Sequence, residues 1–277
     1  FCLGSSLVLG DRPNILFIMS DDHALEAIGS YGSWLREYCP TPTIDKLAEE
    51  GMRFTNVCCN NSICSPSRAS ILTGQYSHKN GVQNLNGSIN EDSPQLAEEL
   101  KKVGYQTAVF GKWHLRSRPV GFDAYKVTRG QGSWFDPVFF TKSNQWYGAK
   151  KKRQIVPGEK HIGYCSDVYT DQALEWLKAR DSNKPFCMML HFKAPHHSYE
   201  YPERWKSYLK DTIIPEPSNL HEDVEETSPR LKGVHTWHMI RKNGYFGRHE
   251  MDEDIPMWPH DGTDRGKSSA AYQHMMH

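Results

Sequence analysis

The sequence predicts an α/β fold in which a mostly parallel central sheet is flanked by helices. Two observations lead to this prediction. Short, almost unbroken apolar runs at 14–20, 107–111 and 186–192 are typical of strands buried in a parallel sheet. Helical patterns with clear start and stop residues alternate with these runs, as they do in α/β layer folds.

The first run, 14–20, is followed by a helix predicted over 42–50. Pro42 suits a first helical turn, and Gly51 is a natural stop. The sequence therefore begins as strand and helix, which is the opening of an α/β layer.

A second helix is predicted to begin around residue 65. Ser65 is a favoured N-cap, Pro66 suits the first helical position, and Gly74 is expected to end the helix. This helix would begin next to a thiol, Cys64.

The next units repeat the alternation. Ser93 is expected to cap a helix that Pro94 starts and Gly104 ends, before the strand 107–111. An amphipathic helix over 166–180 then precedes the apolar run at 186–192.

Two regions do not fit this alternation. Residues 128–165 are rich in Gly, aromatic and basic residues, and we expect an inserted hairpin, loop or lid outside the sheet. Residues 1–10 are apolar with small residues, like the end of a signal peptide, which favours a periplasmic or secreted protein over a short disordered leader.

Composition excludes several classes of protein. The 277 residues are 38% apolar, and 33 basic residues balance 33 acidic ones, so nothing global indicates a nucleic-acid partner or a membrane surface. No apolar run has the length of a transmembrane helix. The cysteine count is odd, and the spacing matches no zinc site; the cysteines are Cys2, Cys39, Cys58, Cys59, Cys64, Cys165 and Cys187.

Polar residues follow three of the predicted strands. Ligands of open parallel sheets bind at the carboxyl ends of the strands, so these residues are expected to share one edge. Their joint presence favours an active site over separate capping, solvated or loop residues. They are Asp21 and Asp22, Lys112 and His114, and His196 and His197.

The chemistry of this set suits an anionic ester. Asp21 and Asp22 offer hard oxygens to Ca²⁺ or Mg²⁺, and the cationic side chains suit a tetrahedral oxyanion. Cys64 lies at a predicted helix start with Arg68 one turn later, which predicts a reactive thiol, although a buried structural cysteine fits the stretch equally well. A thiolate would be an unusual nucleophile for phosphate or sulfate esters and is a soft ligand for a hard metal, so Cys64 is not expected to act as a cysteine.

At this point the sequence resembles the type I, formylglycine-dependent sulfatases of the alkaline phosphatase superfamily. "CSPSRASILTG" at 64–74 is similar to the family signature C-x-P-S-R followed by a short helix and T-G. Four further segments resemble parts of the family. Residues 12–23 resemble its opening strand and metal-binding pair, and 41–56 resemble the helix and turn that lead to the nucleophile. Residues 104–115 resemble its G-K-W-H-L motif, and 194–199 resemble its A-P-H loop, where Ser198 replaces the usual Pro.

The resemblance implies that Cys64 is oxidised to Cα-formylglycine by a formylglycine-generating or sulfatase-maturing enzyme. One hydroxyl of the hydrated aldehyde attacks sulfur and expels the alcohol. The second then loses its proton, the aldehyde re-forms and sulfate leaves, a route that serine lacks.

The resemblance also implies a role for each matching residue. Asp21, Asp22 and residue 64 would hold Ca²⁺, with Mg²⁺ as the alternative. Arg68 would neutralise the carboxylates and hold residue 64, and Lys112 and His114 would position the diol and move its protons. His196 would contact the sulfate or protonate the leaving oxygen, in preference to His197, because the functional histidine of the motif directly follows Pro.

The sequence also departs from the family. The remaining metal ligands and a second active-site lysine of the family have no match before His277, and "HDGTDRG" at 260–266 lacks a preceding strand. Residues 11–277 are therefore expected to be the N-terminal part of a longer sulfatase domain. By itself, that part is expected to be inactive and to expose apolar surface at 186–192 and 166–180.

Two other functions fit parts of the sequence. Phosphonate monoester or phosphodiester hydrolases of the same superfamily can carry the same nucleophile motif. A non-catalytic protein that binds sulfated glycans could use the basic stretch 149–154, although a solvated loop is the simpler interpretation. Intact Cys64, Arg68 and Lys112 argue against such a decayed site.

A sulfated carbohydrate is the expected substrate. The aromatic and polar residues of 128–165 could stack on and hydrogen-bond to a sugar. "GKWHLRSRPVGFD" at 111–123 resembles sulfatases that act on glycosaminoglycans or marine polysaccharides, including N-acetylglucosamine-6-sulfatases.

Overall fold

A computed structural model describes residues 12–143, 158–197, 199–221 and 263. The chain forms two compact units, one from 1–21 and 54–193 and the other from 22–53 and 194–277. The predicted leader at 1–10, the basic stretch 149–154 and the motif at 260–266, apart from Thr263, lie outside the described residues. Across the described part of the chain, every helix is too short or too polar to cross a bilayer.

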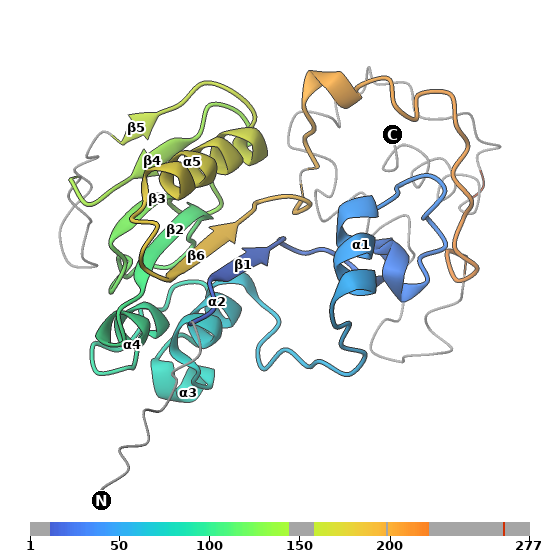
Figure 1. Cartoon of the computed structure of the whole chain (residues 1–277). Coiled ribbons are helices and arrows are strands. Elements are labelled where there is room, and N and C mark those ends of the chain that lie inside the picture. The colour runs from blue at the N-terminus through green and yellow to red at the C-terminus, as the bar shows by residue number, and fades with distance from the viewer. Residues whose placement is uncertain (1–11, 144–157, 198, 222–262, 264–277) are drawn as a thin grey trace, which may run out of the picture. The chain divides into compact units, whose positions relative to one another are not determined.

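The first unit contains a six-stranded sheet with the strand order β1-β6-β2-β3-β4-β5 (Figure 1). The first four strands in this order are mutually parallel, and the last two extend the sheet in antiparallel fashion. The predicted mostly parallel sheet is thus confirmed. The strands are β1 (Ile15–Met19), β2 (Gln106–Lys112), β3 (Ala124–Thr128), β4 (Val138–Phe140), β5 (Glu159–Lys160) and β6 (Phe186–His191).

The sequence predicted that 128–165 lies outside the sheet, but two of its described segments, Val138–Phe140 and Glu159–Lys160, are strands of the sheet. β4 pairs with β3, and β5 pairs with β4, so the region forms a hairpin that widens the sheet at one edge. Its strands are only three and two residues long, and strands this short contain no apolar run from which they could be predicted.

Four helices belong to the first unit: α2 (Cys64–Thr73), α3 (Ser77–Asn80), α4 (Leu96–Lys102) and α5 (Cys165–Ala179). The predicted stop of α2 is confirmed, because Gly74 has φ 66° and its N–H donates to the carbonyl of Ser70 at 2.8 Å. The predicted start of α4 at Ser93 and Pro94 is wrong. Gln95 is the N-cap, and Ser93 N–H instead donates to Asn90 in a preceding turn.

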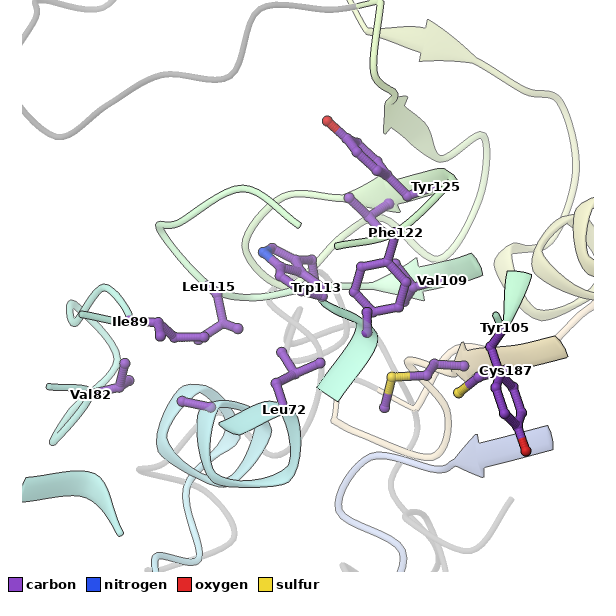
Figure 2. Close-up of a cluster of buried hydrophobic side chains, with 14 residues drawn as sticks. Leu72, Val82, Ile89, Tyr105, Val109, Trp113, Leu115, Phe122, Tyr125 and Cys187 are labelled. Carbon is purple, nitrogen blue, oxygen red and sulfur yellow. The ribbon is translucent and has the colours of Figure 1, made fainter. Parts of the chain in front are cut away.

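One face of the sheet is covered by α2 and α4. Alternate strand residues such as Val109 and Met189 face these helices, while Ile15 and Phe17 of β1 pack at the margin. Figure 2 shows this cluster around Trp113 and Phe122, whose rings meet edge to face with centroids 6.3 Å apart.

The other face is covered by α5. Trp176 of this helix packs on Phe110 of β2 and Phe186 of β6. All six residues of β6 are buried, so the predicted apolar exposure of 186–192 is not found within the strand itself.

β1 was predicted to be buried, but none of its residues is: Ile15, Phe17 and Met19 on one face are half-buried, and the other face is exposed. Leu16 and Ile18 are 51% and 53% exposed. β1 lies at the edge of the described sheet, and the helix on this face, α5, contacts β2 and β6. The apolar surface left open is therefore on β1 rather than on β6.

The second unit holds α1 (Pro42–Glu50), whose bounds agree with the prediction, and short 3₁₀ helices at Leu25–Ala27, Gly29–Tyr31 and Glu203–Trp205. Asp45 of α1 bonds the N–H of Ser30 at 2.6 Å and the hydroxyl of Thr41 at 3.0 Å. These bonds join the helix to the turn that precedes it.

Gly111 of β2 has no room for a side chain where it faces β6. Gly111 lies opposite His191, and a Cβ built on Gly111 would be 2.1 Å from the carbonyl oxygen of His191. Gly111 also has φ +99°, a conformation that L side chains rarely adopt. This contact fixes the strand ends on which the site is built.

Candidate active site

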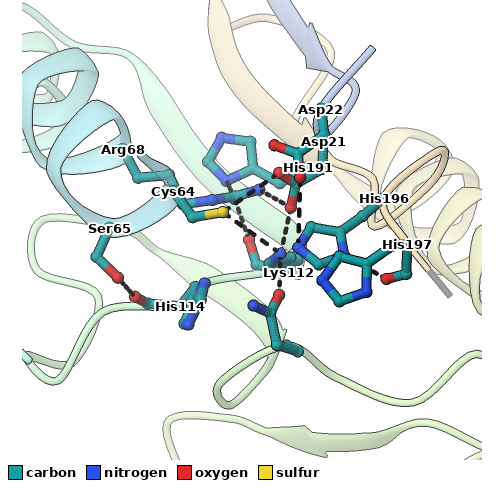
Figure 3. A network of polar contacts seen from close by, with 11 residues as sticks. Asp21, Asp22, Cys64, Ser65, Arg68, Lys112, His114, His191, His196 and His197 are labelled. Atoms are coloured by element: carbon teal, nitrogen blue, oxygen red, sulfur yellow. Dashed lines mark hydrogen bonds and ion pairs between the residues drawn. The ribbon is translucent and has the colours of Figure 1, made fainter. Parts of the chain in front are cut away.

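The register of the sheet brings three strand ends to one level. Met19 of β1 and Gly111 of β2 both lie opposite His191 of β6. Residues just beyond these positions, Asp21 and Lys112, therefore share one edge of the sheet, as the sequence predicted (Figure 3).

Cys64 is the first residue of α2, and Ile63 is the N-cap. The prediction that Ser65 caps the helix is wrong. The hydroxyl of Ser65 is fully buried and donates to the carbonyl of His114 at 2.5 Å, so a tertiary contact replaces the local cap. This bond joins the start of α2 to the loop after β2.

The thiol of Cys64 faces the predicted partners of the first unit. Its Sγ lies 3.6 Å from Oδ1 of Asp21 and 4.0 Å from Nζ of Lys112. The helix N-terminus and the lysine together make the position of residue 64 electropositive.

Arg68 is buried one turn into α2, and its guanidinium joins two strands. Nη2 pairs with Oδ2 of Asp21 at 3.2 Å, and Nη1 donates to the carbonyl of Lys112 at 2.6 Å. Burial lowers the pKa of Arg68, while the charge of Asp21 counteracts this effect. The predicted role of Arg68 as a partner of the carboxylate agrees with this geometry.

Lys112 is fully buried at the end of β2. Its ammonium forms an ion pair with Asp21 and donates to the side-chain oxygen of Gln131. Burial lowers the pKa of Lys112, and Asp21 partly restores it. Asp21 therefore stands between two buried cations.

His191 is a buried histidine that the sequence reasoning did not select. Its Nδ1 lies 3.4 Å from Nη1 of Arg68. Burial, followed by the positive charge of Arg68, lowers the pKa of His191 to about 3. The imidazole is consequently neutral at physiological pH.

Asp22, His196 and His197 belong to the second unit, whereas His114 belongs to the first. Asp22 Oδ2 lies 3.4 Å from Nε2 of His196, which is buried. Nδ1 of His196 contacts the carbonyl of His197, and the two rings stack with centroids 4.4 Å apart. His197 is exposed, which agrees with the preference for His196.

Two predicted site residues have an unusual backbone. Within the described ranges, four non-glycine residues have positive φ, and Asp22 (φ 55°) and His114 (φ 53°) are two of them. Such conformations persist where the surrounding structure enforces them, and they cluster at functional sites. Both residues directly follow or adjoin a strand end of the site.

The donor atoms can be tested against a divalent cation. Asp21 contributes a buried carboxylate, and its Oδ1 is directed to residue 64. A thiol is a soft ligand, but a hydroxyl at residue 64 would be a hard one. The oxygen donors of the first unit therefore suit a hard cation once residue 64 carries oxygen.

A comparison with models of known protein families shows the family to which this chain belongs. The family model described as sulfatase matches residues 13–227. The chain belongs to the sulfatase family.

Several members of this family resemble the chain in detail. It is 44% identical over 217 residues to an N-acetylglucosamine-6-O-sulfatase of Bacteroides thetaiotaomicron, which covers 77% of this chain and 36% of the relative. It is 30% identical over 216 residues to a human N-acetylgalactosamine-6-sulfatase, which covers 66% of this chain and 40% of the relative.

Solved structures agree with this relationship. One structure, a protein in complex with its substrate D-glucosamine-2-N,6-O-disulfate, matches with a TM-score of 0.73 and 35% identity over 96% of this chain and 53% of that chain. A phosphonate monoester hydrolase of Agrobacterium radiobacter shares the fold, with a TM-score of 0.60 and 18% identity over 96% of this chain and 56% of that chain. The sulfatase chain spans about a third to just over half of these proteins.

Three polar residues of the first unit escaped the sequence reasoning: Gln131, His191 and Lys193. His191 is the last residue of β6, and a polar residue inside an apolar run is the signal that could have selected it, whereas Lys193 lies two positions beyond the strand. Gln131 lies between Gly130 and Gly132, which both have positive φ, and "GQG" after a strand is the only local sign of its loop.

Proposed function

We propose that the protein hydrolyses sulfate esters of a sulfated sugar, with residue 64 as the nucleophile after oxidation to formylglycine. The observation that carries this proposal is the position of Cys64, at the start of α2 between Asp21 and Lys112. A negatively charged ester placed here meets the ammonium of Lys112 and the helix N-terminus.

The balance of charge in the first unit supports an anionic substrate. Asp21 is the carboxylate that both Arg68 and Lys112 contact, so two cations share one anion. Buried charges are stable when they are paired, and a sulfate group would supply the missing negative charge.

The proposed steps use the residues of this chain. One hydroxyl of the hydrated aldehyde at residue 64 passes its proton to the neighbouring carboxylate of Asp21 and forms a bond to sulfur as the bond from sulfur to the sugar oxygen breaks. Lys112 holds the anionic group, and His196 gives a proton to the departing oxygen. His114 takes the proton of the second hydroxyl, the carbon–oxygen bond to sulfate breaks, and the aldehyde re-forms.

A divalent cation, Ca²⁺ or Mg²⁺, would be held by Asp21, Asp22 and residue 64. When bound, it supplies positive charge that stabilises the negative charge developing on the sulfate oxygens. The role of His196 rests on the A-P-H motif and on its pairing with Asp22.

The proposed substrate class is a 6-O-sulfated amino sugar. This part of the proposal rests on the names of the bacterial and human relatives and on the sulfated glucosamine bound in the matching structure. The export predicted from residues 1–10 is consistent with this substrate, because an exported enzyme would meet such sugars outside the cytoplasm.

The test compares protein produced with and without a sulfatase-maturing enzyme. Peptide mass spectrometry should show that the thiol of residue 64 is replaced by an aldehyde only in the first preparation. Only that preparation should release sulfate from 6-O-sulfated N-acetylglucosamine. Faster cleavage of a phosphonate monoester or an aryl phosphodiester would assign the protein to the alternative activity, and full activity with an unmodified thiol would overturn the mechanism.

A further inference from the structure

Lys193 is a buried cation for which the proposed steps have no use. It is the last residue of the first unit, two positions after β6, and its side chain is 4% exposed. Its Nζ lies 4.7 Å from the centre of the Trp134 ring. This cation–π contact is the interaction that the structure gives to the ammonium.

No acid and no hydrogen-bond acceptor pairs with Lys193 among the residues that the structure describes. Cys165 is within electrostatic range, but burial raises the pKa of its thiol, so it remains uncharged. Asp21 is also in range, yet its carboxylate is already engaged by Arg68 and Lys112. Within the residues that the structure describes, the ammonium thus has no counter-ion of its own.

A buried ammonium without a counter-ion raises the free energy of the folded protein unless an anion binds to it. Water solvates an exposed ammonium far better than one aromatic ring does, so a buried and unpaired lysine destabilises the protein. Burial and the nearby charge of Lys112 lower the pKa of Lys193 accordingly. A cation retained at this position indicates a partner that arrives from solution.

The position of the ammonium is well defined. Trp134 is 8% exposed and stacks on Tyr164, with centroids 6.0 Å apart and an interplanar angle of 14°. The carbonyl of Trp134 accepts a hydrogen bond from the N–H of Cys165 at 2.7 Å, which ties the ring to the start of α5. Lys193 is therefore held in place before any ligand binds.

We infer that Lys193 is an anion-binding residue of this site, and that its ammonium contacts the oxygens of the sulfate group beside Lys112. The inference rests on the proposed function and deepens it, because it assigns a second lysine to the recognition of the anion. Arg68, Lys112 and Lys193 place three cations against the carboxylate of Asp21. A dianionic tetrahedral ligand such as inorganic sulfate balances this excess.

The test measures binding of inorganic sulfate by titration calorimetry, so it does not depend on turnover. Lys193→Met should weaken sulfate binding at least about tenfold, the usual effect of losing a hydrogen bond to a charged group. Its melting temperature without sulfate should stay the same or rise, because a buried charge without a partner has been removed. Lys184→Met is the matched control, since Lys184 is 60% exposed, and it should leave both quantities unchanged.

A purely structural role for Lys193 predicts the opposite pattern. Lys193→Met would then lower the melting temperature through loss of the contact with Trp134, and sulfate affinity would stay within about twofold. That result, or failure of the unsubstituted protein to bind sulfate, overturns the inference. If the Met variant does not fold, Lys193→Gln is measured in the same way. Sulfate binding without ester hydrolysis would reject the proposed function and keep the inference.

Discussion

Arg68 and Asp21 form a buried ion pair, with Nη2 and Oδ2 3.2 Å apart, that joins helix α2 to the end of β1. Arg68 also donates to the carbonyl of Lys112, so one side chain connects a helix and two strands. The position of residue 64 relative to the sheet therefore depends on this guanidinium.

Replacing Arg68 should destabilise the whole first unit. Arg68→Ala leaves the buried carboxylate with one cation fewer and removes the bond to the Lys112 carbonyl, so we expect a loss of about 3–5 kcal/mol in the free energy of unfolding. Urea denaturation of the parent protein and the variant measures this difference in the free energy of unfolding. Arg118→Ala is a control for the loss of one arginine, and a loss below about 1 kcal/mol for Arg68→Ala would contradict the structural role assigned to the pair.

Replacing Cys64 should remove turnover and preserve the fold. Cys64 is half-buried at the first position of α2, and Ala is a good helix former there. Cys64→Ser should accumulate a covalent sulfate ester, since a single hydroxyl can attack sulfur but has no route to release the product. Intact-mass measurement detects the adduct, and steady turnover by either variant would exclude residue 64 as the nucleophile.

Divalent cation binding should depend on Asp21. Asp21→Asn keeps the shape of the side chain and removes its charge, so Ca²⁺ affinity should fall by at least about tenfold. Calorimetry on protein freed of metal by chelation, followed by addition of Ca²⁺ or Mg²⁺, measures the affinity. Asp123→Asn, far along the chain at the start of β3, is the control, and equal affinities of the two variants would argue against a cation on Asp21.

Gly111 should tolerate no side chain. A Cβ there would lie 2.1 Å from the carbonyl oxygen of His191, so Gly111→Ala must push β2 and β6 apart. We expect a loss of more than about 3 kcal/mol, whereas Gly74→Ala should cost about 1–2 kcal/mol. Gly74 also has positive φ but has nothing within 4 Å of the added atom, so the difference between the variants measures the clash. Similar losses would mean that the strands can separate freely.

Acid should destabilise the protein partly through His191. The pKa of His191 is about 3 in the folded state and 6.5 in the unfolded chain, so below pH 6.5 the unfolded state binds more protons. The stability from the neutral imidazole is complete above pH 6.5 and is lost as the pH falls toward 3. Plots of unfolding free energy against pH should be flatter for His191→Gln than for the parent protein. His78→Gln, at an exposed site, controls for the loss of an imidazole, and parallel plots for His191→Gln would contradict a buried neutral histidine.

The sequence was sufficient for features that local chemistry controls. The apolar runs predicted β1, β2 and β6 but not the parallel strand β3, and Pro42 and Gly51 predicted the bounds of α1. Parallel strands end at one edge, so the order of residues along the chain was enough to place Asp21 and Lys112 together. The predicted helix caps were wrong: α2 begins before Ser65, whose hydroxyl bonds the distant carbonyl of His114, and Ser93 lies in a turn two residues before Gln95, the N-cap of α4.

The missed residues depend on contacts that no local pattern encodes. Gln131 lies in an irregular loop, and it belongs to the site only because its side-chain oxygen accepts a hydrogen bond from Lys112, which is distant in the sequence. In the sequence, Lys193 resembles an ordinary loop lysine, and only the structure shows its ammonium against the ring of Trp134. Burial of a polar residue by a remote segment is a tertiary property, and for such residues composition and spacing give no warning.

The burial of Ser65 and Arg68 has a consequence for the order of events in biosynthesis. Ser65 is fully buried and Arg68 is 3% exposed, and Pro66 between them is buried as well. An enzyme that recognises these side chains in order to oxidise the neighbouring cysteine meets them only while the polypeptide is still extended. The folded protein buries the residues of the proposed modification signal, so the proposed oxidation of residue 64 would have to precede folding, and molecules that fold first would keep an unmodified thiol.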